Sequence, residues 1–262
     1  MQIILLTPVL ILLSFQESFG QQKFQLAPPM LKYESGFFSG KTSLEVIFNQ
    51  PGAEVRYTVN GNEPTEKDRL YSNPIPITQK TLVKVKAFGN DYLPSETVTA
   101  SFITEGKKIK QAIYSKPNES YANSKANILH DNIGGQVNYR SGSWVGFDND
   151  TVTVGIELQK KESVSKVLIS LLQDENSWIF LPEQILVYYF NDQQKAFLPL
   201  GKETFQFDEP GPKQVNIREI QPSMAVTTKQ LKLVFFPLKK IPGWHNGKGN
   251  HGWLFLDEIK VY

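Results

Sequence analysis

Apolar and polar residues alternate with a period of two along much of this chain, and this pattern constrains its fold more than any other feature. In residues 151–158 every second position is Val, Ile or Leu, and residues 55–59 and 83–87 show a similar alternation. A period of two places the apolar side chains on one face of a strand. Little signal for helices appears anywhere, so the sequence predicts an all-β chain.

Turn residues divide the first part of the chain into short strands. The dipeptide Asn60-Gly61 follows one alternating run and is typical of a tight turn. Strands at such close spacing favour a small antiparallel sandwich over residues 27–104. A polar stretch containing Gly follows at residues 104–108, and we place the domain boundary there.

The second part of the chain, residues 109–262, is larger and again rich in predicted strands. Apolar strand candidates lie at residues 164–172, 185–190 and 231–236, and long polar loops separate them. β structure of this size with long loops is typical of a jelly-roll sandwich.

Residues 1–20 have the pattern of a signal peptide. The apolar run at residues 3–15 is shorter than the roughly 20 residues that span a bilayer, and small residues follow at Ser18 and Gly20. The alternative is an uncleaved anchor. We expect a secreted, periplasmic or cell-surface protein with no transmembrane segment in the mature chain.

Charge and cysteine content exclude several classes of function. The chain has 28 Lys and Arg against 26 Asp and Glu, a net charge of +2, with the two signs mixed along it. Such a balance gives no basic patch for nucleic acid or an anionic membrane surface. With 0 Cys, the exported chain depends on core burial rather than disulfides for its stability.

No catalytic arrangement can be read from the sequence. No G-x-S-x-G elbow occurs, and His245 and His251 lack a third zinc ligand at a suitable spacing. Asp257-Glu258 is an acidic pair of the kind that some sugar hydrolases use. Because it lies in the strand-like run at residues 253–262, alternation predicts that the two carboxylates point to opposite faces and do not converge.

Residues 56–75 resemble the Y-T-x-D-G-x-x-P-T…Y…P-I signature of the chitobiase/β-hexosaminidase C-terminal domain. The resemblance implies a small Ig-like sandwich over residues 27–104. Asn60 stands where Asp is usual in that family. The matching residues are Tyr57, Thr58, Gly61, Pro64, Thr65, Tyr71, Pro74 and Ile75.

The second region resembles the discoidin-like (coagulation-factor type C, galactose-binding-like) domain that follows this module in secreted bacterial β-N-acetylhexosaminidases. The matching segments are residues 129–135, 144–147, 177–182 and 252–261. Such enzymes carry their catalytic pair on a preceding (α/β)₈ barrel, which needs about 250 residues. Only a few residues lie between the predicted signal peptide and the first module, so we expect no catalytic residues.

The resemblance also implies a structural Ca²⁺ ion. In discoidin-like modules the ion commonly sits near the loop that matches Asp131, and its ligands include backbone carbonyls and a carboxylate from the last strand, here Glu258. Hard oxygen ligands suit Ca²⁺. The alternative is an Asp turn and a surface Glu.

Sugar-binding modules of this fold hold their ligands at loop tips, where an aromatic ring packs on the sugar and polar groups read its hydroxyls. The corresponding ligand-binding candidates here are Arg140, Trp144, Trp178, Trp244 and His245. For Trp144 and Trp178 a core position is the alternative, and Trp253 is predicted to be core.

The sequence thus predicts a secreted, non-catalytic protein that binds glycans through terminal sugars such as Gal, GalNAc or GlcNAc. One alternative is that the chain is classed as a β-N-acetylhexosaminidase by its similarity to that enzyme's accessory region. Another is an adhesion or scaffold protein that binds a protein partner. An exposed Trp beside polar groups in a pocket indicates sugar binding, and a broad apolar patch indicates a protein interface.

Overall fold

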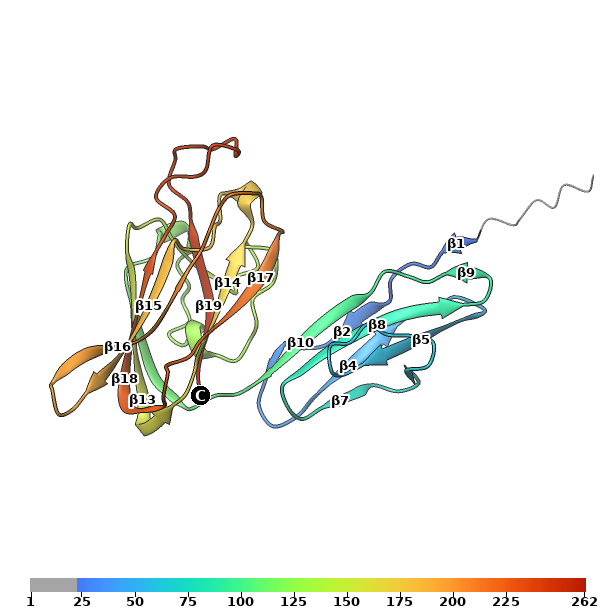
Figure 1. The fold of residues 1–262 in the computed structure, drawn as a ribbon, viewed down its shortest axis with the longest axis horizontal. Coiled ribbons are helices and arrows are strands. Elements are labelled where there is room, and N and C mark those ends of the chain that lie inside the picture. The colour runs from blue at the N-terminus through green and yellow to red at the C-terminus, as the bar shows by residue number, and fades with distance from the viewer. Residues whose placement is uncertain (1–22) are drawn as a thin grey trace, which may run out of the picture.

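Two β-sandwiches, the first mainly and the second wholly antiparallel, lie next to each other and are joined by residues 105–108 (Figure 1). The computed structural model describes residues 23–262, and the predicted signal peptide at residues 1–20 lies outside them. The chain is nearly all β, as the alternation predicted. Within the described part, no helix is long and apolar enough to cross a membrane.

The first sandwich packs a five-stranded sheet against a three-stranded sheet around its own apolar core. Alternation in the central strand β8 (Thr81–Gly89) buries Val83, Val85 and Ala87, and Phe102 and Leu44 pack with them. The five-stranded sheet has the order β3 (Phe37–Phe38), β10 (Val98–Thr104), β8 (Thr81–Gly89), β5 (Ala53–Thr58) and β6 (Arg69–Leu70). The three-stranded sheet has the order β2 (Met30–Lys32), β4 (Thr42–Ile47) and β7 (Ile75–Ile77), and β1 (Phe24–Gln25) pairs with β9 (Tyr92–Leu93).

The turn after β5 explains why Asn60 can stand where Asp is usual. Its side-chain oxygen accepts a hydrogen bond from the backbone N–H of Asn62 at 3.1 Å, which is an Asx turn that either residue can form. Gly61 between them has φ +80, a conformation that favours glycine. The amide therefore preserves the geometry of the turn.

The second sandwich packs a five-stranded sheet against a four-stranded one, with every strand pair antiparallel. The five-stranded sheet has the order β11 (Ile109–Tyr114), β13 (Val152–Val164), β18 (Val226–Phe236), β15 (Gln184–Asn191) and β16 (Ala196–Thr204). The four-stranded sheet has the order β12 (Val145–Phe147), β19 (Leu254–Val261), β14 (Val167–Gln173) and β17 (Gln214–Ile220). The predicted all-β fold with two sandwiches is confirmed.

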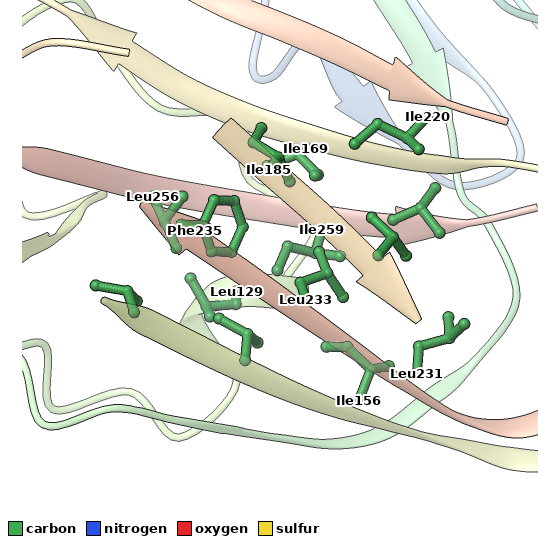
Figure 2. Packing of buried hydrophobic residues seen from close by; sticks show 14 of the residues in the cluster. Leu129, Ile156, Ile169, Ile185, Ile220, Leu231, Leu233, Phe235, Leu256 and Ile259 are labelled. Atoms are coloured by element: carbon green, nitrogen blue, oxygen red, sulfur yellow. The ribbon is translucent and has the colours of Figure 1, made fainter. Parts of the chain in front are cut away.

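Side chains from both sheets fill the space between them (Figure 2). Ile156, Leu233 and Phe235 come from the larger sheet, and Ile169 and Leu256 come from the smaller one. Leu129 from the short 3₁₀ turn η2 (Ile128–His130) closes the core and is completely buried. The turns η1 (Glu119–Tyr121) and η3 (Glu175–Ser177) are the other helical segments among residues 23–262.

A β-bulge in β19 corrects the prediction for the acidic pair. Between the paired positions Ile169–Ile259 and Leu171–Leu256, strand β14 has one residue, Ser170, and β19 has two. Because Leu256 and Ile259 both face the core, Asp257 and Glu258 both face outward beneath the loop that follows η2. The extra residue of a bulge interrupts the alternation on which the prediction rested.

Candidate functional site

A cavity of about 240 Å³ lies where strand β14 ends and β19 begins. Four segments far apart in the sequence meet there: η1, the loop before β12, η3 and the entry to β19. The residues that line it are Tyr121, Tyr139, Asn176, Ser177, Ile179, Trp253 and Phe255.

Aromatic rings form one wall of this cavity. The ring centroid of Tyr121 lies 5.2 Å from Trp253, 5.0 Å from Phe255 and 6.0 Å from Tyr139, all in edge-to-face geometry. Phe255 is buried at the base, whereas Tyr121, Tyr139 and Trp253 are half-buried. Edge-to-face pairs of this kind stabilise one another, so the wall is held rigid while part of each ring faces the cavity.

Polar groups supply the other side of the cavity. Asn176 is exposed and Ser177 is half-buried, and both belong to η3. The Ser177 hydroxyl donates to Asp174 at 3.0 Å, and Lys213 lies 2.8 Å from the same carboxylate. These contacts fix the turn, so that the Asn176 amide projects from a defined backbone position.

Trp178 follows η3 directly and has a left-handed backbone, with φ 61. Its side chain is 36% exposed, the largest exposed fraction of the four Trp in the chain. One part of the indole packs against Gly247, where a Cβ atom would come within 2.7 Å of the ring. The ring is therefore held against the glycine-rich loop and still faces solvent, while its chain neighbours Ser177 and Ile179 line the cavity.

Arg140 adjoins the cavity. Its side chain is exposed, and its guanidinium stands 5.2 Å from the ring centroid of Tyr139, which lines the cavity. None of the five predicted ligand-binding residues lines the cavity itself, although Arg140 and Trp178 are exposed and adjoin residues that do.

His245 is a structural residue rather than an exposed one, which corrects its predicted role. Its Nε2 lies 2.9 Å from the carbonyl oxygen of Glu175, and its Nδ1 accepts from the N–H of Gly247 at 2.9 Å. The side chain is buried, with both ring nitrogens occupied. It fixes the glycine-rich loop against η3, where no ligand can reach it.

Trp244 and Trp144 are likewise used in packing. The Trp244 indole N–H donates to the carbonyl of Phe207 at 2.8 Å, and the half-buried ring packs near Phe180. Trp144 is 3% exposed and donates to the carbonyl of Gln136 at 2.8 Å. For Trp144 this burial corrects the expectation of a ring available to a ligand.

Sequence reasoning missed Tyr121, Tyr139 and Asn176, and it assigned Trp253 to the core. Tyr121 lies in the short turn η1 and Tyr139 lies in a loop, and neither segment has a periodicity that indicates which way its ring faces. A signal did exist for Tyr139, because it neighbours the candidate Arg140 in the sequence.

The outward-facing acidic pair lies away from this cavity and is almost fully buried. Burial raises the pKa of Asp257 to about 8 and that of Glu258 to about 7. Asp257 accepts from the Gly135 N–H at 2.5 Å and from the Ser170 hydroxyl at 3.3 Å. Lys260 faces Glu258 and opposes the upward shift of its pKa. Donors therefore face both oxygens of Glu258 but only one of Asp257, whose Oδ1 is buried without a hydrogen-bond partner.

The first sandwich contains a larger cavity of about 370 Å³, lined by residues that include Gly52, Glu54, Phe88 and Asn90. Its one aromatic residue, Phe88, is buried. It lacks an open aromatic wall, so we place the candidate site in the second sandwich.

Comparison with protein families gives a match for the first sandwich. Residues 33–99 match the family model described as the chitobiase/beta-hexosaminidase C-terminal domain. The resemblance predicted for the first domain is confirmed. No curated protein matches this chain.

Several solved structures are similar to part of the chain. A pectin-binding carbohydrate-binding module shares 18% identity, covers 59% of this chain and 91% of its own, and has a TM-score of 0.36. The CBM32 of AlyQ, in complex with 4,5-unsaturated mannuronic acid, shares 10% identity over 60% and 97% of the two chains, with a TM-score of 0.39. A Clostridium perfringens CBM32 in complex with GalNAc-beta-1,3-galactose shares 12% identity over 58% and 94%, with a TM-score of 0.38. At these identities and TM-scores, the similarity does not identify a ligand for this chain.

Proposed function

We propose that this protein is a non-catalytic carbohydrate-binding protein whose second sandwich holds a terminal sugar in the cavity between η1, η3 and β19. The observation that carries the proposal is that three half-buried aromatic rings and the polar side chains of η3 line the same cavity. Tyr121 and Trp253 offer apolar surface, and Asn176 offers a donor and an acceptor.

This combination matches the chemistry of a pyranose. The C–H groups on one face of the sugar ring pack on an aromatic surface, and its hydroxyls need directional hydrogen-bond partners. The exposed Arg140 guanidinium beside Tyr139 adds a cluster of donors at the rim. Because both kinds of surface are held by the fold, little conformational freedom is lost on binding.

The size of the cavity supports recognition of a chain end. Its volume of about 240 Å³ is smaller than the roughly 300–1,000 Å³ typical of pockets that enclose a drug-sized ligand. One sugar residue and part of the next fit such a space better than an extended polysaccharide. Terminal Gal, GalNAc and GlcNAc structures are the first ligands to test.

Secretion belongs to the same proposal. The apolar run at residues 3–15 followed by small residues supports export by a signal peptide, and glycans are abundant outside cells. The first sandwich then serves as a spacer that carries the sugar-binding domain.

A protein-binding role is the second candidate, and a separate surface favours it. Ile113 is 68% exposed and Phe197 is 36% exposed. Both line a shallow cavity on the outer face of the larger sheet of the second sandwich. Exposed apolar surface of this kind is common at protein interfaces.

A glycan array with the mature chain, residues 21–262, tests the proposal. We expect binding to a coherent set of terminal sugars, and we expect the Trp253→Ala variant to lose that binding. Phe197→Ala, on the outer sheet face, is the matched control and should bind like the wild type. A blank array from protein with a β-rich circular dichroism spectrum and a cooperative melt would overturn the glycan proposal in favour of the protein-binding one.

A further inference from the structure

A buried ion pair between Lys260 and Glu258 lies beneath the loop that follows η2 (residues 131–135, here called the η2 loop). The resemblance implies a calcium ion at this place. The Lys260 ammonium lies 3.2 Å from a carboxylate oxygen of Glu258. It also donates to the side-chain oxygen of Asn132 at 2.5 Å. The side chains of Lys260 and Glu258 are only 4% and 1% exposed.

The residues around this pair do not fit a calcium ion. Ca²⁺ takes 6–8 oxygen ligands at about 2.3–2.6 Å. Here the N–H of Asn132 donates to both carboxylate oxygens of Glu258, at 3.2 and 3.1 Å. One oxygen of Asp131 accepts from the Ile133 N–H at 2.9 Å, and the other lies 3.6 Å from the Lys125 ammonium. The expected ligand atoms are thus directed at hydrogen-bond donors and at cationic side chains.

Among residues 23–262, no group of three or more His, Cys, Asp or Glu side chains is placed to hold a metal ion. The backbone supports the arrangement that is present, because Asn132 adopts φ 65. Asn tolerates this left-handed conformation better than most residues, and it directs the Asn132 N–H toward Glu258.

We infer that the Lys260 ammonium is a built-in replacement for the divalent cation at this site. It neutralises Glu258, whose charge would otherwise be buried without a partner, and it holds the η2 loop through Asn132. A buried carboxylate that loses its only cation is strongly destabilising. The second sandwich is therefore folded and stable without Ca²⁺.

The same ammonium reaches the first sandwich. Lys260 Nζ lies 4.8 Å from the ring centroid of Phe37, within cation–π distance. Phe37 also packs in an apolar cluster with Ile103, Leu168 and Tyr262, which come from both domains. Beside this cluster, the hydroxyl of Ser35 in the first sandwich accepts a hydrogen bond from the N–H of Gly134 in the η2 loop at 3.1 Å.

The site thus joins three parts of the molecule: the last strand, the η2 loop and the first sandwich. Further contacts lie beside it, since Tyr262 donates to the Thr104 carbonyl at 2.7 Å and Lys80 pairs with Glu219 at 2.7 Å. Lys260 therefore contacts the first sandwich through Phe37 and the η2 loop through Asn132.

Thermal unfolding of the two-domain chain, with excess Ca²⁺ or with EDTA, tests this inference. We expect wild-type melting temperatures to agree in the two buffers, and calorimetric titration with CaCl₂ to show no binding. Lys260→Met keeps the apolar stem on Phe37 but removes the charge, and it should lower the melting temperature. The double variant Lys260→Met/Glu258→Gln removes both charges and should recover much of the loss, because no unpaired charge remains.

Two results would overturn the inference. The first is a wild-type melting temperature that rises with Ca²⁺, or a titration that shows Ca²⁺ binding. The second is a double variant that is no more stable than Lys260→Met. If Lys260→Met does not fold, Lys260→Arg replaces it: the retained charge should keep the melt independent of Ca²⁺, and a Ca²⁺-dependent melt would contradict the inference.

Discussion

The backbone N–H of Trp253 donates to the carbonyl oxygen of Trp178 at 2.8 Å, and this bond ties an exposed ring to the wall of the candidate sugar site. The two residues lie far apart in the sequence, yet Ile179 and Trp253 also form a β-bridge. The hydrogen bond and the bridge hold the two tryptophan residues side by side.

Replacing Trp178 by Ala should weaken glycan binding by about 1–3 kcal/mol, the range for losing one buried aromatic contact. The indole is 36% exposed, so its removal should cost the fold little. Isothermal titration with the sugar found on the array measures the loss, and a thermal melt checks the fold. Affinity equal to that of the wild type would remove Trp178 from the site.

Asn176→Ala should reduce affinity by about 0.5–1.5 kcal/mol, the net value of one hydrogen bond. The amide lines the cavity and is exposed, so the melting temperature should not change. Asn246→Ala is the matched control, because it removes an exposed Asn from the neighbouring loop outside the cavity. Equal losses in the two variants would show that Asn176 makes no specific contact.

Gly247→Ala should displace the Trp178 ring, because the added Cβ would lie within 2.7 Å of it. We expect a changed Trp fluorescence spectrum and weaker sugar binding. Gly243→Ala, in the same loop, meets nothing within 4 Å and should leave both measurements unchanged. Wild-type binding by Gly247→Ala would mean that the position of Trp178 does not affect affinity.

His245→Ala should lower the free energy of unfolding by about 1–3 kcal/mol, because it leaves the buried Gly247 N–H without its partner. It also removes one of the two hydrogen bonds to the Glu175 carbonyl, which still accepts from the Trp178 N–H. Urea denaturation measures this change. Lys248→Ala, at an exposed position of the same loop, should stay within about 0.5 kcal/mol of the wild type. A direct ligand role for His245 would instead show as lost binding with unchanged stability.

Local sequence patterns predicted the strands well. The alternation at residues 83–87 and 151–158 became β8 and the start of β13, with the apolar side of each strand buried. This works because the period of a strand is a property of its own backbone. The turn at Asn60-Gly61 was equally local, since the Asx turn and the positive φ involve adjacent residues.

The sequence by itself therefore determined the all-β class, the two-sandwich organisation and the family resemblance of the first domain. The tertiary structure decided the rest. A bulge opposite β14 turned the side chains of Asp257 and Glu258 to the same, outer face of the sheet. The packing of the two domains placed Lys260 between Glu258 and Phe37. The tertiary structure also gathered the aromatic wall from loops separated by more than a hundred positions. Contacts of this kind depend on which strands pair and how loops pack over them, and no local periodicity encodes that choice.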